Sequence, residues 1–260
     1  MNYRNVLRLA TLLALVLLPG LTLRATAHPS FTVYDNLFYQ GKPNTTQAGL
    51  VVSNILYESD IWPGKVGYGT LPSRSRFAEA VREHDQNPGP LVLDIEHIAL
   101  RGDPQTAQSN EQTLATLADW ARADAPGKIV GFFGTGTLSK VDAADLPLAQ
   151  ALAQHVDALF PPLYATGPDQ ANWRQHAVDA MAEARSIAPG KPVYFYLWPQ
   201  YVTGSKHEFE YLSASYWAYQ LQQSQALANG VVLWSPSRFS WDDSSGWWEA
   251  TVQFVRSVSS

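Results

Sequence analysis

The stretch Pro90-Leu91-Val92-Leu93-Asp94-Ile95-Glu96-His97 joins a run of branched apolar residues to two carboxylates. A strand that is apolar on both faces is typical of the buried parallel strands of α/β folds. Side chains alternate along a strand, so Asp94 and Glu96 should project from the same face, about 6.5–7 Å apart. Two acids on a buried face are costly unless they are partnered or functional. The stretch therefore predicts a buried strand with two candidate catalytic carboxylates, the alternative being a structural acid that caps amides of the next loop.

The rest of the chain alternates apolar segments with segments of helical periodicity. The expected strands are residues 31–34, 50–57, 90–97, 128–133, 158–164, 192–197 and 231–234. The expected helices are residues 73–84, 104–122, 142–155, 172–188 and 209–228, with a last helix ending near Val258. This alternation predicts a parallel α/β barrel, and the glycine fingerprint of the open nucleotide-binding sheets is missing. We expect one domain, residues 28–260, folded as a distorted TIM-like (β/α) barrel of about seven to eight β/α units.

The N-terminal residues have the pattern of an export signal. Arg4 and Arg8 precede an apolar run, and Ala25-Thr26-Ala27 is a small-x-small cleavage pattern. The alternative is an uncleaved membrane anchor, but Pro19-Gly20 interrupts the run and leaves it short for a membrane span. We therefore expect a signal peptide over residues 1–27 and a periplasmic or secreted bacterial protein.

Charge and composition limit the classes of partner and cofactor that the protein could bind. Removing residues 1–27 takes away three arginines and no acid, which changes the net charge from −5 to −8. This balance argues against nucleic acid and anionic membrane surfaces as partners. The chain has no cysteine, which excludes thiol catalysis, and its histidines show no metal-binding spacing. We expect a monomer with no metal and no cofactor, and no stable membrane insertion after signal cleavage.

Aromatic residues recur where the expected strands end. Side chains at the C-terminal ends of parallel strands meet at one rim, where barrel enzymes carry their chemistry. Aromatic faces stack on the apolar faces of sugar rings, and tyrosine hydroxyls hydrogen-bond to sugar oxygens. The candidate substrate-binding residues are Tyr34, Tyr57, Tyr164, Tyr196, Trp198, Trp234 and Trp241. Together with Asp94 and Glu96 they predict a site for a polysaccharide or oligosaccharide.

Other catalytic chemistries lack their motifs. The sequence has no G-x-S-x-G elbow, and Ser235 is only a weak nucleophile candidate. Neither a phosphate-binding loop nor a lysine at a strand tip is present. Carboxylate-driven hydrolysis remains the best-supported reaction class.

Seven segments in order resemble the hyaluronidases, a family of glycoside hydrolases. The segments are Phe31-Thr32-Val33-Tyr34-Asp35-Asn36, Ile55-Leu56-Tyr57-Glu58 with Trp62-Pro63, residues 92–96, Gly131-Phe132-Phe133-Gly134, Phe160-Pro161-Pro162-Leu163-Tyr164, Pro192-Val193-Tyr194-Phe195-Tyr196 and Gly230-Val231-Val232-Leu233-Trp234-Ser235. The Asp-x-Glu strand also occurs in chitinase-like and lysozyme-like barrels. The resemblance covers most of the chain after the signal segment.

The resemblance implies a retaining, substrate-assisted mechanism. Glu96 would be the general acid and base, and Asp94 would orient the 2-acetamido group whose carbonyl attacks the anomeric carbon. The resemblance also implies that Tyr164 and Tyr196 contact the sugar and that Trp234 forms a wall of the site.

The sequence departs from the family at several points. His97 replaces the aromatic residue that often follows the glutamate, the disulfides are absent, and the chain is shorter than the animal enzymes. With a net charge of −8, these departures favour a neutral or N-acetylated glycan of a bacterial wall, capsule or biofilm over hyaluronan. Two alternatives stay open: a non-catalytic glycan-binding barrel or polysaccharide-export accessory protein, and a lysozyme-like wall hydrolase that pairs Glu96 with Asp35 or Asp242.

Overall fold

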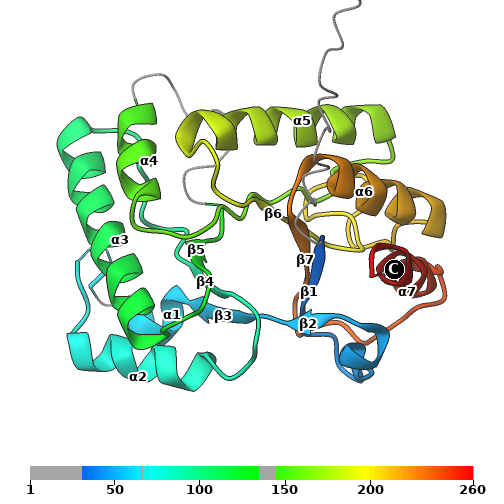
Figure 1. Cartoon of the computed structure of the whole chain (residues 1–260), viewed down its shortest axis with the longest axis horizontal. Coiled ribbons are helices and arrows are strands. Elements are labelled where there is room, and N and C mark those ends of the chain that lie inside the picture. The colour runs from blue at the N-terminus through cyan, green and yellow to red at the C-terminus, as the bar shows by residue number, and fades with distance from the viewer. Residues whose placement is uncertain (1–30, 66, 69, 135–144, 260) are drawn as a thin grey trace, which may run out of the picture.

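The computed structural model describes residues 31–65, 67–68, 70–134 and 145–259 of the chain (Figure 1). The predicted signal segment, residues 1–27, and the beginning of the helix predicted over residues 142–155 lie outside the described residues. None of the helices in these described ranges is both long and apolar enough to cross a membrane.

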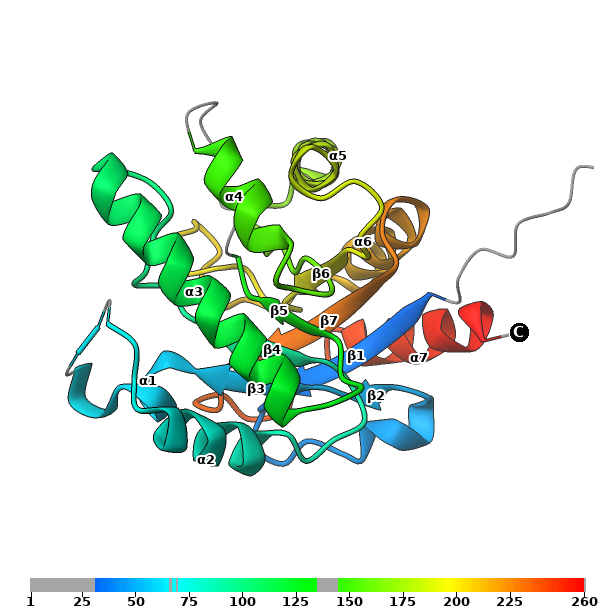
Figure 2. The ribbon, with the colours of Figure 1, turned by 60° about the vertical axis from the view of Figure 1, so that its left-hand side comes forward.

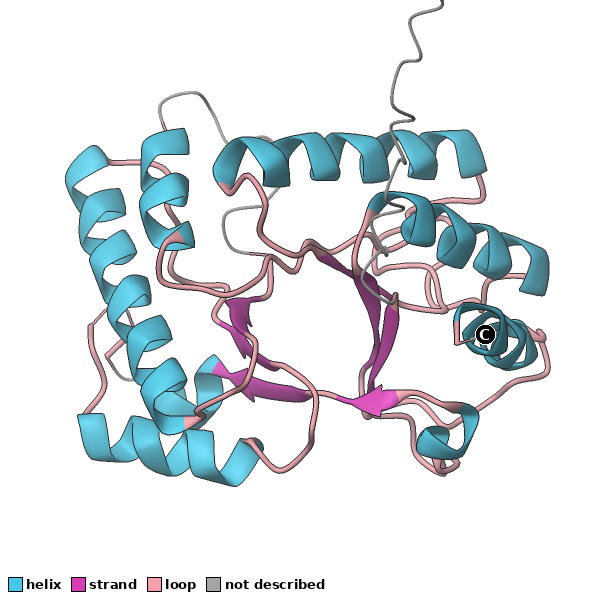
Figure 3. Ribbon diagram, viewed as in Figure 1, coloured by secondary structure: helices cyan, strands magenta, loops and turns pink. Residues whose placement is uncertain are grey.

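Parallel strands surround a central axis, with helices on the outside (Figures 1 and 2). The strands are β1 (Thr32–Leu37), β2 (Val51–Val52), β3 (Asn54–Tyr57), β4 (Leu91–Asp94), β5 (Val130–Phe132), β6 (Tyr194–Leu197) and β7 (Gly230–Ser235). They pair in parallel in the orders β2-β1-β7-β6 and β3-β4-β5 (Figure 3). This arrangement confirms the predicted (β/α) barrel and brings the C-terminal ends of all the strands to one end of the molecule.

Short irregular segments lie between the two pieces of sheet. Ser53 separates β2 from β3, and its amide donates to the carbonyl of Asp35 at 2.9 Å. On the other side, residues 158–164 form only isolated parallel bridges, from Phe160 to Phe133 and from Pro162 to Tyr196. Proline lacks the amide that a strand donates, so Pro161-Pro162 interrupts the strand expected over residues 158–164. The barrel is distorted at these two places.

The outer helices are α2 (Arg74–His84), α3 (Pro104–Asp124), α4 (Leu146–Ala153), α5 (Gln170–Ile187), α6 (Ala214–Leu227) and α7 (Trp247–Val258). A side chain caps the first turn of α2, α3, α5 and α6 through a hydrogen bond. The helix predicted from residue 209 begins only at Ala214, because Ser213 caps it and Phe209 has a left-handed φ of +64°. The short helix α1 (Glu58–Ile61), directly after β3, was not predicted from the sequence.

Side chains fill the interior of the barrel below its C-terminal end. This inner cluster consists of Tyr34, Val92, Ala158, Phe160, Tyr194, Tyr196 and Val232. The ring of Tyr194 lies 5.4 Å from that of Tyr34 and 5.5 Å from that of Phe160, centroid to centroid. A Cβ at Gly131 would lie 2.5 Å from the carbonyl oxygen of Ala158, so this close approach requires glycine. These packed side chains make the interior of the barrel a core rather than a pore.

Candidate active site

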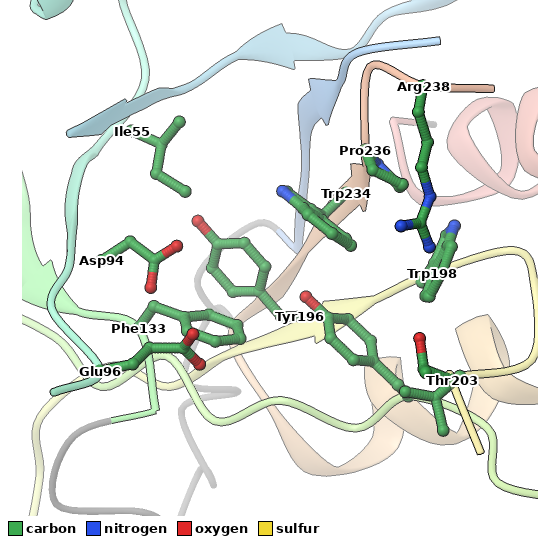
Figure 4. Close-up of a pocket in the computed structure, with 12 residues that line it drawn as sticks. Ile55, Asp94, Glu96, Phe133, Tyr196, Trp198, Thr203, Trp234, Pro236 and Arg238 are labelled. Atoms are coloured by element: carbon green, nitrogen blue, oxygen red, sulfur yellow. The ribbon is translucent and has the colours of Figure 1, made fainter. Parts of the chain in front are cut away.

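A cavity of about 290 Å³ lies at the C-terminal end of the barrel (Figure 4). Its lining residues are Ile55, Asp94, Glu96, Phe133, Tyr164, Tyr196, Trp198, Val202, Thr203, Trp234, Pro236 and Arg238. Figure 4 shows Asp94 and Glu96 on one side of the cavity and Trp198, Trp234 and Arg238 on the opposite side. Acids and aromatic rings thus face each other across a space that could hold part of a glycan.

Asp94 and Glu96 reach the cavity as their alternation along the chain predicts. Asp94 ends β4 and Glu96 follows in the next loop, while Ile95 between them is fully buried in the core. Asp94 is partly buried, and its Oδ1 atom is buried without a hydrogen-bond partner among the described residues. Glu96 is exposed at the mouth of the cavity. The unpartnered oxygen of Asp94 is available to a ligand donor.

Burial raises the pKa of Asp94 to about 7, with further contributions from the negative charges of Glu96 and Glu58. Removing a carboxylate from water disfavours its charged form, and nearby like charges act in the same direction. Asp94 therefore exchanges its proton near neutral pH.

Three aromatic side chains form the wall opposite the acids. The rings of Tyr164 and Trp234 stack at 5.7 Å with an interplanar angle of 25°, and Trp198 packs edge-on against Trp234 at 5.4 Å. The Trp198 indole N–H donates to Oε1 of Gln200 at 3.1 Å, which fixes the ring. The Trp234 indole N–H donates to the hydroxyl of Tyr57 at 3.4 Å. These rings offer a rigid apolar surface on which a sugar ring could stack.

Two tyrosines from the predicted set lie at the cavity with their hydroxyls kept neutral. Burial raises the pKa of Tyr164 and of Tyr196 well above the usual value, and negative charge on Asp94 adds to both effects. The side-chain amide of Asn36 donates to the hydroxyl oxygen of Tyr196 at 3.2 Å. Each hydroxyl therefore keeps its proton and can donate it to an oxygen of a ligand.

Arg238 brings a positive charge to the cavity. Its guanidinium carbon lies 4.6 Å from the ring centroid of Phe209 and 4.9 Å from that of Phe239, so two cation–π contacts orient it. In the described part of the chain no carboxylate pairs with Arg238. The negative net charge of the chain gave no indication of this local positive charge.

Three predicted substrate-binding residues do not line the cavity. Tyr34 is buried in the inner cluster on β1, and its ring packs against Tyr194. Trp241 lies in the loop before α7, and its ring packs against Trp247 at 4.9 Å and Trp248 at 5.1 Å. Tyr57 does not line the cavity but supports its wall through the hydrogen bond from Trp234. The expectation that Tyr34 and Trp241 line the site is therefore corrected.

The carboxylates considered as alternative partners of Glu96 are also outside the cavity. Asp35 is buried and occupied by Lys42 at 2.8 Å, by the Leu37 amide at 2.8 Å and by the hydroxyl of Thr45. Asp242 is exposed and accepts a hydrogen bond from the Ser244 amide at 2.9 Å. Both carboxylates thus have structural roles, and neither lines the cavity with Glu96.

Several lining residues were not singled out from the sequence. They are Ile55, Phe133, Val202, Thr203, Pro236 and Arg238. Pro236 and Arg238 follow directly after β7, so the rule that placed Trp234 at the rim could have included them. Val202 and Thr203 lie in the long connection from β6 to α6, for which the sequence offers no periodic signal.

No family model matches the sequence, and the search of curated proteins finds no match. Among solved structures, bee venom hyaluronidase has a TM-score of 0.61 at 16% identity, over 88% of this chain and 97% of that chain. Bee venom hyaluronidase in complex with a hyaluronic acid tetramer has a TM-score of 0.59 at 15% identity, and the match covers 88% of this chain and 96% of that chain. The fold is that of barrel glycosidases. A GH18 chitinase from Pseudoalteromonas aurantia has a TM-score of 0.53 at 15% identity, and the match covers 85% of this chain and 99% of that chain.

Proposed function

We propose that this protein is an exported glycoside hydrolase that cleaves a glycan containing N-acetylhexosamine. The observation that carries the proposal is the position of Asp94 and Glu96, side by side at the mouth of the barrel and facing an aromatic wall. Carboxylic acids supply the proton transfers of glycoside hydrolysis, and aromatic faces bind pyranose rings. The fold shared with a hyaluronidase and a chitinase supports the same proposal.

A retaining, substrate-assisted mechanism fits the acids at the site. Among the described residues that line the cavity, Asp94 and Glu96 are the only carboxylates, and both come from one strand and its loop. The described lining therefore has no acid on the opposite side, as would be needed to activate water for inversion or to attack the sugar directly. An acetamido group on the substrate can supply the missing nucleophile.

In this mechanism Glu96 donates a proton to the glycosidic oxygen while the acetamido carbonyl oxygen attacks the anomeric carbon. The bond to the leaving oxygen breaks, and Asp94 accepts the hydrogen bond of the acetamido N–H. Water then attacks the anomeric carbon from the face that the leaving group occupied, the bond between that carbon and the acetamido oxygen breaks to restore the acetamido group, and Glu96 takes the proton of the water. Tyr164 and Tyr196 donate hydrogen bonds from their hydroxyls, and Trp234 stacks on the sugar.

Activity should fall as the pH rises through about 7. The pKa of Asp94 near 7 means that the acidic pair keeps a proton up to that pH, and the reaction requires one proton on the pair. We expect kcat/KM to decline on the alkaline side with an apparent pKa near 7, measured across a pH series in buffers of constant ionic strength. A flat profile between pH 6 and 9 would contradict this assignment.

Arg238→Ala should raise KM about tenfold and change kcat less than about threefold. The guanidinium lies on the far side of the cavity from the acids, so it can bind the glycan without joining the proton transfers. Steady-state kinetics on a carboxylated and a neutral glycan would show which substrate depends on this cation. Arg256→Ala, a change on α7 away from the cavity, is the matched control.

The proposal is tested by release of reducing ends from a panel of glycans. We expect the purified protein to act on at least one polymer of N-acetylhexosamine, alone or alternating with another sugar. Binding of such a glycan without release of reducing ends would support a non-catalytic glycan-binding barrel instead. Sequencing the N-terminus of protein recovered outside the cytoplasm tests the export proposal, which expects a start at His28.

A further inference from the structure

A third carboxylate, Glu58, holds the loop that carries Glu96. Glu58 begins α1 directly after β3, and its side chain is 16% exposed. Its Oε2 atom accepts the backbone N–H of His97 at 3.2 Å, and its Oε1 atom accepts the hydroxyl of Tyr68 at 3.2 Å. The imidazole Nδ1 of His97 also contacts Oε1. One carboxylate therefore ties the residue directly after Glu96 to the neighbouring strand.

Aromatic contacts extend this connection into the loop after β3. The rings of Tyr68 and His97 lie 4.9 Å apart with an interplanar angle of 32°, and Tyr68 packs edge-on against Trp62 at 5.8 Å. The Trp62 indole N–H donates to the carbonyl of Thr70 at 3.0 Å. The loops that follow β3 and β4 are thus fastened together beside the cavity.

Glu96 depends on this support because its own side chain makes few interactions that would hold it in place. Its side chain is exposed, and in the described ranges no group forms a hydrogen bond with its carboxylate. A general acid must be held within a fraction of an ångström of the oxygen that it protonates. The restraint on Glu96 therefore comes from the backbone on either side of it, which is buried Ile95 and the His97 amide held by Glu58.

We propose that Glu58 is a positioning residue that orients the general acid Glu96 through the backbone of His97 and biases the protonation of the acidic pair. The inference rests on the proposed function. The effect on the protonation of the acidic pair follows from charge, because Glu58 and Glu96 are the negative groups that act on Asp94. The tyrosines around Asp94 are neutral, namely Tyr57, Tyr164 and Tyr196. The charged groups of α2 near α1, Arg76 and His84, contact Asp60 and not Glu58.

Two variants separate the hydrogen bonds of Glu58 from its charge. Glu58→Ala removes both, and we expect kcat to fall about 10- to 100-fold with KM changed less than about twofold. Glu58→Gln keeps an oxygen that accepts from the His97 amide, so kcat should stay within about threefold of wild type. In both variants the alkaline limb of the pH profile should move to lower pH, because removing a negative charge lowers the pKa of Asp94. Asp60→Asn, which neutralises another acid of α1, should leave the limb in place.

Amide hydrogen exchange tests the inference without a substrate. The His97 amide should exchange faster in Glu58→Ala than in wild type, whereas Glu58→Gln should retain protection. If wild type releases no reducing ends from any glycan but exchange changes as expected, the proposed function fails and the restraint stands. Wild-type kcat, an unshifted pH limb and unchanged exchange in Glu58→Ala would overturn the positioning role.

Discussion

Glu96→Gln should lower kcat about 1,000-fold and leave the fold unchanged. Glutamine has the same shape but carries no proton that it can donate to the glycosidic oxygen, so the leaving group must depart as an alkoxide. The side chain is exposed and has no hydrogen-bond partner among the described residues, so the substitution breaks no contact. Single-turnover kinetics on the best glycan of the panel measures the effect, and the melting temperature should stay within about 1 °C of wild type.

Glu83→Gln is the matched control for this variant. Glu83 is an exposed residue of α2 and does not line the cavity. The control removes the same charge and should leave kcat and KM unchanged. Near-normal turnover in Glu96→Gln would remove Glu96 from the mechanism.

Asp94→Asn should lower kcat about 100-fold or more and at the same time stabilise the protein at pH 8. The asparagine amide keeps an oxygen that can accept from the acetamido N–H but carries no negative charge, so the positive charge that develops on the acetamido group as its carbonyl attacks is no longer stabilised. The pKa of Asp94 is near 7 in the folded protein against an ordinary value of 3.8, so ionising it costs folding free energy. The loss begins as the pH rises above about 4 and is complete above about pH 7, by an amount on the order of 4 kcal/mol.

Unfolding at several pH values checks this prediction. At pH 8 the melting temperature of Asp94→Asn should exceed that of wild type by about 8–16 °C, and the difference should vanish near pH 4. At the lower pH Asp94 is protonated in the folded chain and half-protonated in the unfolded one, so the penalty is nearly absent. A variant that is less stable than wild type at pH 8 would show that the Asp94 carboxylate is stabilised in the fold.

The barrel could be predicted because its pattern is local. Apolar runs such as residues 91–94 and caps such as Ser73 fix strands and helices over short distances, and parallel alternation leaves few arrangements. Asp94 and Glu96 could be placed at the mouth because side chains alternate along a strand. Helix α1, only four residues long, escaped prediction because it is too short for a periodic signal.

The depth and direction of single side chains could not be predicted in the same way. Tyr34 and Trp234 both follow apolar strand residues, yet Tyr34 points into the packed interior and Trp234 reaches the cavity. The difference depends on strand register, in which Asn36, two residues after Tyr34, pairs with Trp234. The position of Arg238 after β7 could have placed it at the rim, but the direction of its guanidinium depends on the rings of Phe209 and Phe239, which the sequence does not bring together.

The configuration of the first sugar product tests the central account most directly. Proton NMR, recorded during digestion of a glycan with N-acetylhexosamine at the cleavage point, reports the anomer before it equilibrates in water. An acetamido group that attacks the anomeric carbon, with Asp94 and Glu96 on one side of the cavity, predicts the same anomer as in the substrate. An inverted first product would contradict the account, because it requires a second carboxylate opposite Glu96, and the part of the cavity lining that the structure describes contains none.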